Sequence, residues 1–159
     1  YDIVTFEHLL DEFPSMVDYA VNDLDINIDN FFNMFLKSDI YEGFVKSDPF
    51  IILGHSGVEL AIKIAKENKL EVINTSSTLY LRDLSREYWL GQYLIMFIQE
   101  TSNSLKEIFE KIKPSELLNL YNPYHEMDIS SFVAEVNKHL NEIGNSRLFL
   151  LTRKKNISI

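Results

Sequence analysis

Residues 6–24 read FEHLLDEFPSMVDYAVNDL, and this stretch places the fold among the helical classes. Its apolar residues fall at positions 6, 9, 10, 13, 16, 17, 20, 21 and 24, the spacing of one face of a helix. Pro14 stands in the middle, where it either begins a second helix as a first-turn residue or kinks a single longer one. The stretch therefore predicts two short helices or one bent helix with a buried face.

The same periodicity recurs along the rest of the chain. Asp29 is expected to cap a helix with a nearly continuous apolar surface, and the pattern Ser56-x-x-Glu59 predicts a capping box that starts a helix over 57–68. A long apolar helix from Ser85 should be central, and shorter helices should follow at 104–112, 114–121 and 128–143. We expect a mainly α fold, a compact bundle of about seven helices in one domain over residues 1–159.

The segment LEVINTSSTLYLRDL at 70–84 departs from this pattern. It is poor in helix formers and rich in Thr, Val and Ser, which favours a loop with short extended pieces. Residues 147–152 also change period and suggest a strand. We therefore allow for a small two-strand β element formed by parts of 70–82 and 147–152, and for an internal boundary near 69–84.

Composition limits the class of protein. Of the 159 residues 46% are hydrophobic and 13% aromatic, which predicts a packed core rather than disorder. The absence of cysteine excludes disulfides and thiolate sites and fits a reducing compartment. No apolar run approaches the roughly 18 residues needed to span a bilayer. We expect a cytoplasmic protein that is not embedded in a membrane.

The net charge of −9 is unevenly distributed. Residues 1–80 contain 14 acidic and 5 basic residues, whereas residues 81–159 contain 10 of each, and the first basic residue is Lys37. A negative field repels phosphate backbones and attracts cationic surfaces. This distribution disfavours nucleic acid and predicts a basic protein partner for the acidic N-terminal half. The simpler alternative is that the surplus acid only keeps the protein in solution.

The stretch YNPYHEMDIS at 121–130 holds three groups able to do chemistry: His125, Glu126 and Asp128. One hypothesis is a catalytic or metal site, since imidazole near carboxylates sets a proton-transfer pKa close to neutral. However, the second His of the helical zinc signature is missing. The alternative is a joint in which Pro123 ends one helix and Asp128 caps the next. We favour the joint, and expect no catalytic residue, metal or cofactor.

The stretch GHSGVEL at 54–60 is similar to a nucleophile elbow or a phosphate loop but satisfies neither pattern. Gly57 follows Ser56 directly, and Val58 stands where the phosphate loop requires Lys. What remains is a helix N-terminus with His55 beside it, whose free N–H groups could hold an anion. The alternative is a plain helix cap.

Further binding candidates lie in SREYWLGQYL at 85–94. Trp89 and Tyr88 could line a groove for a peptide or a base, although packing of the large aromatic in the core is the favoured interpretation. Gly91 lowers helix stability, so we expect it to let another backbone approach closely. The candidate binding residues are Arg86, Tyr88, Trp89, His55, Ser56 and Tyr121.

A third hypothesis concerns DNA. The stretch IMFIQETSNSLKEIFEKI at 95–112 has the outline of a helix, a short turn and a second helix, as in helix-turn-helix regulators. Glu107 and Glu110 alternate with the lysines of the second helix, so that helix has no basic face.

Several segments together resemble a known family. They are MVDYAVNDL, FFNMFLKSDI, PFIILGHSGVELA, EYWLGQYL, SLKEIF and LLNLYNPYHEMDISSFV, with Trp89, Tyr121, Pro123, His125, Glu126 and Asp128 at shared positions. In this combination the chain resembles an uncharacterised family of small Firmicute proteins encoded near ADP-ribosyltransferase-like toxin genes. The resemblance implies a gene neighbourhood rather than a mechanism.

These observations favour a non-enzymatic protein-binding module. We expect an antitoxin-like or accessory component of a bacterial toxin–antitoxin or defence gene cluster, which binds a basic protein partner through its acidic N-terminal half. The alternatives are a small enzyme or an anion- or metal-binding protein with a site around His125 and Glu126, and a helix-turn-helix regulator. The oligomeric state is left open.

Overall fold

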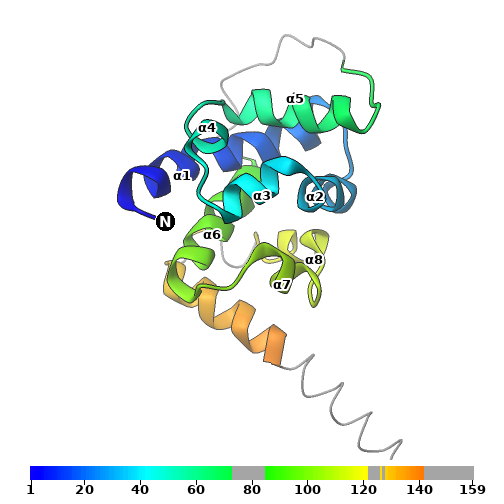
Figure 1. Cartoon of the computed structure of the whole chain (residues 1–159). Coiled ribbons are helices and arrows are strands. Elements are labelled where there is room, and N and C mark those ends of the chain that lie inside the picture. The colour runs from blue at the N-terminus through cyan, green and yellow to red at the C-terminus, as the bar shows by residue number, and fades with distance from the viewer. Residues whose placement is uncertain (73–84, 122–125, 127, 142–159) are drawn as a thin grey trace, which may run out of the picture.

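The computed structural model describes residues 1–72, 85–121, 126 and 128–141 (Figure 1). Helices dominate these ranges and no strand occurs within them, which confirms the mainly α fold. No helix in the same ranges is long and apolar enough to cross a membrane. The predicted β element and the segment 73–84 of the predicted boundary lie outside the described residues, apart from residues 70–72, which are not in a strand.

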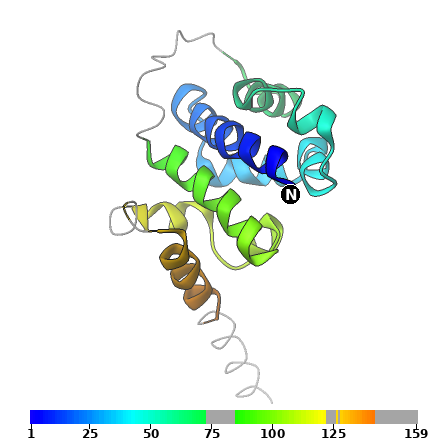
Figure 2. The same ribbon diagram turned by 90° about the vertical axis from the view of Figure 1, so that its left-hand side faces the viewer.

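From α1 to α5, and again from α6 to α8, the helices follow one another with short connections. In chain order they are α1 (Ile3–Asp18), the π-helix η1 (Tyr19–Asp23), α2 (Ile28–Leu36), α3 (Asp39–Val45), α4 (Pro49–Ile52), α5 (Gly57–Glu67), α6 (Arg86–Thr101), α7 (Leu105–Phe109) and α8 (Pro114–Leu118). Residues 129–141 form a further helical segment. In Figures 1 and 2, α5 lies on one side of α1 and α6 on the other, with α7, α8 and the segment 129–141 beyond α6.

The opening stretch forms one helix rather than two. Asp2 caps it by accepting the backbone N–H of Thr5 at 3.0 Å, and Pro14 lies inside α1. One residue after the proline, the Ser15 hydroxyl donates to the Asp11 carbonyl at 2.8 Å. The helix then widens into η1 without a break. Of the two predicted outcomes, the single long helix is the observed one.

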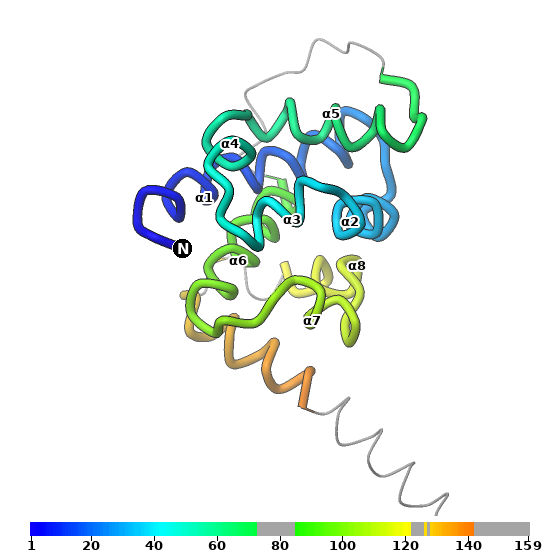
Figure 3. The backbone as a smooth tube through the Cα atoms, viewed as in Figure 1, coloured from blue at the N-terminus to red at the C-terminus, as the bar shows by residue number. Residues whose placement is uncertain are grey.

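Helices α5 and α6 both pack on α1 (Figure 3). A glycine in each of them allows the close approach near Pro14. A Cβ atom on Gly91 of α6 would lie 2.6 Å from the Pro14 Cα, so backbone meets backbone at this crossing. On the other side, a Cβ on Gly57 of α5 would collide with the Glu12 carbonyl oxygen. The close approach predicted at Gly91 is confirmed.

An aromatic cluster fills the space between α1, α2 and α3. Phe13 is fully buried, and its ring centroid lies 5.8 Å from that of Phe35 and 6.0 Å from that of Phe44. Phe31 and Phe32 of α2 pack on the same cluster. Tilted and edge-to-face contacts of this kind add stability beyond that of the buried area alone. The prediction that α2 is core material is confirmed.

The helix caps differ from the predicted ones at two places. Asn27, not Asp29, caps α2, because Asp29 instead accepts the backbone N–H and the hydroxyl of Ser115 at 2.9 and 2.7 Å. Asp29 therefore joins α2 to α8. At α5 only half of the predicted capping box is present: Ser56 accepts the Glu59 N–H at 3.2 Å, but the Glu59 carboxylate does not bond back to the Ser56 N–H. A full capping box forms instead between Ser104 and Glu107, where none was predicted.

The α1–α6 crossing gives a stability prediction. Gly91→Ala should destabilise the protein by about 1–3 kcal/mol, because the new methyl group forces the crossing apart. Alanine would otherwise favour the helix by about 1 kcal/mol. Urea denaturation measures the difference, with Glu100→Ala on the exposed side of α6 as a control that should change stability by less than about 0.5 kcal/mol. A Gly91→Ala protein at least as stable as the wild type would contradict the close crossing.

Candidate functional site

Large apolar side chains are exposed where the start of α1, the end of α3 and α4 come together. Figures 1 and 2 both show these three elements side by side. Phe50 is 84% exposed and Ile3 is 72% exposed, values far from those of core residues. The residues that we call the exposed apolar surface are Ile3, Val4, Val45, Phe50 and Leu53. Large apolar side chains left exposed on neighbouring elements are typical of sites of protein interaction.

Local structure fixes the position of Phe50. Asp48 caps α4 by accepting the Phe50 backbone N–H at 3.0 Å, and Pro49 occupies the first turn. Ile52 is buried and anchors the helix, which leaves Phe50 on the outward side. His55 contacts the Phe50 carbonyl oxygen through its Nδ1 atom at 3.1 Å. The aromatic ring is thus presented by a short, capped helix rather than by an unanchored loop.

Acidic side chains continue from this surface along α1. Glu7 and Asp11 follow Ile3 at intervals of four residues, so all three share the outer face of the helix, and all three are exposed. Neither carboxylate forms an ion pair within the described ranges. Hydrogen bonds from Thr5 hold the pKa of Asp2 below its ordinary value, so this carboxylate stays charged at neutral pH. The outer face of α1 is therefore apolar at its start and negative beyond it.

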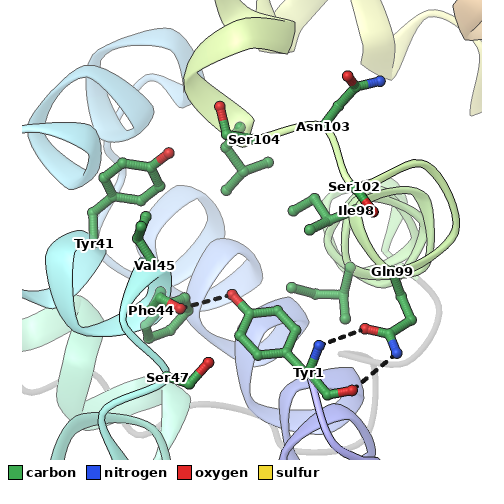
Figure 4. Close-up of a pocket in the computed structure, with 12 residues that line it drawn as sticks. Tyr1, Tyr41, Phe44, Val45, Ser47, Ile98, Gln99, Ser102, Asn103 and Ser104 are labelled. Carbon is green, nitrogen blue, oxygen red and sulfur yellow. Dashed lines mark hydrogen bonds between the residues drawn. The ribbon is translucent and has the colours of Figure 1, made fainter.

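A pocket of about 340 Å³ opens beside the exposed apolar surface (Figure 4). It lies between the start of α1, α3 and the C-terminal end of α6, and Val45 belongs both to the pocket and to the surface. Its lining combines aromatic, aliphatic, amide and hydroxyl side chains and contains no charged side chain; it includes Tyr1, Tyr41, Phe44, Val45, Ile98 and Gln99.

Tyr1 is held in the pocket wall by three hydrogen bonds. Its phenol donates to the Phe44 carbonyl at 2.9 Å, its backbone nitrogen donates to Gln99 Oε1 at 3.0 Å, and Gln99 Nε2 donates to its carbonyl at 3.1 Å (Figure 4). Burial, together with the nearby Tyr41 phenol, raises the pKa of Tyr1 to about 12. The lining side chains are therefore uncharged at physiological pH, while the charged N-terminal ammonium of Tyr1 is bound to Gln99.

The structure buries the aromatic candidates of α6. Trp89 is 7% exposed and packs on Tyr93, Tyr121 and Phe132, with ring centroids 5.0 to 5.6 Å apart. Tyr88 is also buried. The favoured interpretation, core packing of Trp89, is confirmed, while a role in binding stays a prediction. The indole Nε1 of Trp89 is buried and has no hydrogen-bond partner among the described residues.

Arg86 lies at the edge of a buried polar cluster. Its Nε donates to Glu87 at 3.4 Å, and Glu87 is only 7% exposed. Asn22 of η1 links Glu87 to Asp18, with donor distances of 3.4 and 2.8 Å, and Asp18 also accepts the Ser85 hydroxyl. This network ties the start of α6 to the end of the first helix.

The α5 N-terminus, proposed to hold an anion, already contacts a carboxylate of this chain. The backbone N–H of Gly57 donates to Glu12 of α1, and that of Glu59 donates to the Ser56 hydroxyl. These bonds use two of the N–H groups that an anion would need. An anion at His55 and Ser56 stays a prediction, and the observed contacts are those of a cap.

The corner at 126–128 shows the predicted cap. Asp128 accepts the backbone N–H of Ser131 at 2.8 Å, and this bond holds the pKa of Asp128 below its ordinary value. Glu126 is exposed, and His125 lies outside the described residues. No group of three or more His, Cys, Asp or Glu side chains in the described ranges could hold a metal ion. His55 is remote from this corner, because α5 and the segment 129–141 lie on opposite sides of α1 and α6.

The stretch proposed to read DNA does form a helix, a turn and a helix. However, α7 contains only five residues, and its N-cap Ser104 is locked in the capping box with Glu107. A helix of about one and a half turns is short for insertion along a major groove.

Comparisons with known proteins add no assignment. No protein-family model, curated protein or solved structure matches this chain. The site is therefore interpreted from its own geometry.

The cap at Asp128 gives a prediction that separates structure from chemistry. Asp128→Ala should increase backbone hydrogen exchange over residues 129–133, whereas Asp128→Asn should not, because Asn is an equally good cap. Since the folded-state pKa of Asp128 lies below 3.8, the ionised cap persists at neutral pH and is lost only as the pH falls through that lower value. Equal exchange in both variants would contradict the capping role.

Proposed function

We propose that this protein is a non-enzymatic, cytoplasmic protein-binding module, an antitoxin-like or accessory component of a bacterial toxin–antitoxin or defence gene cluster. It binds a basic protein partner through its acidic N-terminal half. The observation that carries the proposal is the exposed apolar surface at the start of α1, continued by the exposed carboxylates of Glu7 and Asp11, which form no ion pair with any residue that the structure describes.

The exposed apolar surface and the carboxylates of Glu7 and Asp11 contribute differently to binding. The apolar side chains lose contact with water on binding and supply affinity, most of it from a few large residues such as Phe50. The carboxylates raise the association rate and fix the orientation of a cationic partner. The partner should therefore present an apolar centre next to Lys or Arg side chains.

The gene neighbourhood implied by the family resemblance names the first partner to test, the product of the adjacent toxin-like gene. The catalytic alternative around His125 and Glu126 receives no separate support, because the Asp128 carboxylate serves as a helix cap.

The proposal predicts the effect of one exposed residue on binding. Phe50→Asp should weaken the complex with the adjacent gene product by about 2 kcal/mol or more, because it removes a large apolar contact without touching the core. Isothermal titration calorimetry of each variant with the separately purified partner measures the affinity. Leu70→Asp is the matched control, because Leu70 is also a large apolar residue that is exposed. Leu70 follows the C-terminal end of α5, whereas Phe50 lies before the N-terminal end of that helix. Replacing Leu70 should therefore leave the affinity unchanged.

The dependence of the binding rates on salt concentration provides a second test of the proposal. Raising the ionic strength should lower the association rate more than it raises the dissociation rate, because the carboxylates act mainly on encounter. Failure of the wild-type chain to form any complex at low salt would refute the proposed partner.

A further inference from the structure

The side chains that line the pocket beside the exposed apolar surface are uncharged. No Asp, Glu, Lys, Arg or His side chain lines it, and its floor includes Phe44, Ile95, Ile98 and Leu105. A cationic group that entered would lose hydration without gaining a counter-charge, because the charged group of Tyr1 is itself an ammonium. A cavity of about 340 Å³ lies within the range of small-ligand pockets. The apolar floor and the flat aromatic walls favour an uncharged ring.

Both aromatic walls are fixed before anything binds. Tyr1 is held by its three hydrogen bonds to Phe44 and Gln99. Tyr41 is 6% exposed, and the Lys106 ammonium lies 5.7 Å from the centroid of its ring. Walls that are already ordered lose little conformational entropy when a ring enters between them.

The Tyr41 hydroxyl determines which ring fits best. It accepts the backbone N–H of Lys106 at 3.4 Å, and it donates to no acceptor within the described part of the chain. Figure 4 shows this hydroxyl directed toward the Ser104 side of the pocket. Its hydrogen is therefore available to an acceptor on the ligand. An indole offers only a donor, and a plain phenyl ring offers neither, but a phenol can accept.

We propose that this pocket binds the phenol ring of a tyrosine side chain on the protein partner, with the Tyr41 hydroxyl donating to the phenol oxygen. The inference rests on the proposed function, because Val45 makes the pocket continuous with the surface that the partner covers. Tyrosine is also among the residues that most often dominate the energetics of protein interfaces.

The pocket chemistry is tested with p-cresol, the side-chain analogue of tyrosine, and with toluene, its analogue without the hydroxyl. NMR titration of the full chain should show p-cresol perturbing the amides of Val45, Ile98 and Leu105. Tyr41→Phe should weaken p-cresol by about fivefold and leave toluene unchanged. Val45→Trp should block both probes, whereas Leu70→Trp, at a distant exposed position, should block neither. Absence of perturbation at the pocket, or equal p-cresol affinity in Tyr41→Phe, would overturn the assignment.

The same variants identify the occupant. Tyr41→Phe removes only a buried hydroxyl, so it leaves the exposed apolar surface intact and should weaken the partner complex by about fivefold. If p-cresol binds as expected but Tyr41→Phe and Val45→Trp leave the complex unchanged, the pocket takes a free phenolic molecule and the assignment to a partner side chain is wrong. If the wild-type chain forms no complex, the proposed function fails, while the p-cresol titration still decides the pocket chemistry.

Discussion

The crossing of α1 with its two neighbours is the constraint on which the rest of the structure depends. Gly91 brings the α6 backbone against Pro14, and Gly57 brings the α5 N-terminus against the opposite side of the same helix. On a third side of α1, Phe13 packs in the aromatic cluster of α2 and α3. Because three sides are buried, only a narrow outer face of α1 remains for solvent or for a partner.

The burial of three sides of α1 determines which of its side chains remain exposed. The start of α1 extends past the crossing, where the short helix α4 and the end of α3 cover its side but not its outer face. Ile3, Val4 and Phe50 are therefore exposed beside the carboxylates of α1, and the pocket opens next to them. The buried polar network of Asp18 and Glu87 holds the other end of the helix in place.

Periodicity and glycine placement sufficed to predict the helical class, the central helix α6 and the close approach at Gly91. The Asp128 cap followed from local chemistry in the same way. The Asp29 cap was wrong because a long-range contact with Ser115 determines that side chain. The exposed apolar surface was missed because the apolar run PFIIL at 49–53 does not by itself show which of its residues face the core. Only the three-dimensional structure shows that a four-residue helix buries Ile52 while exposing Phe50.

Hydrogen exchange of the complex tests the central claim most directly, because it locates the covered surface without altering the chain. The account predicts that the partner protects the start of α1, the end of α3 and α4. It also predicts no added protection in α8 or over residues 129–141. Protection centred on that far segment instead, with the start of α1 unchanged, would contradict it.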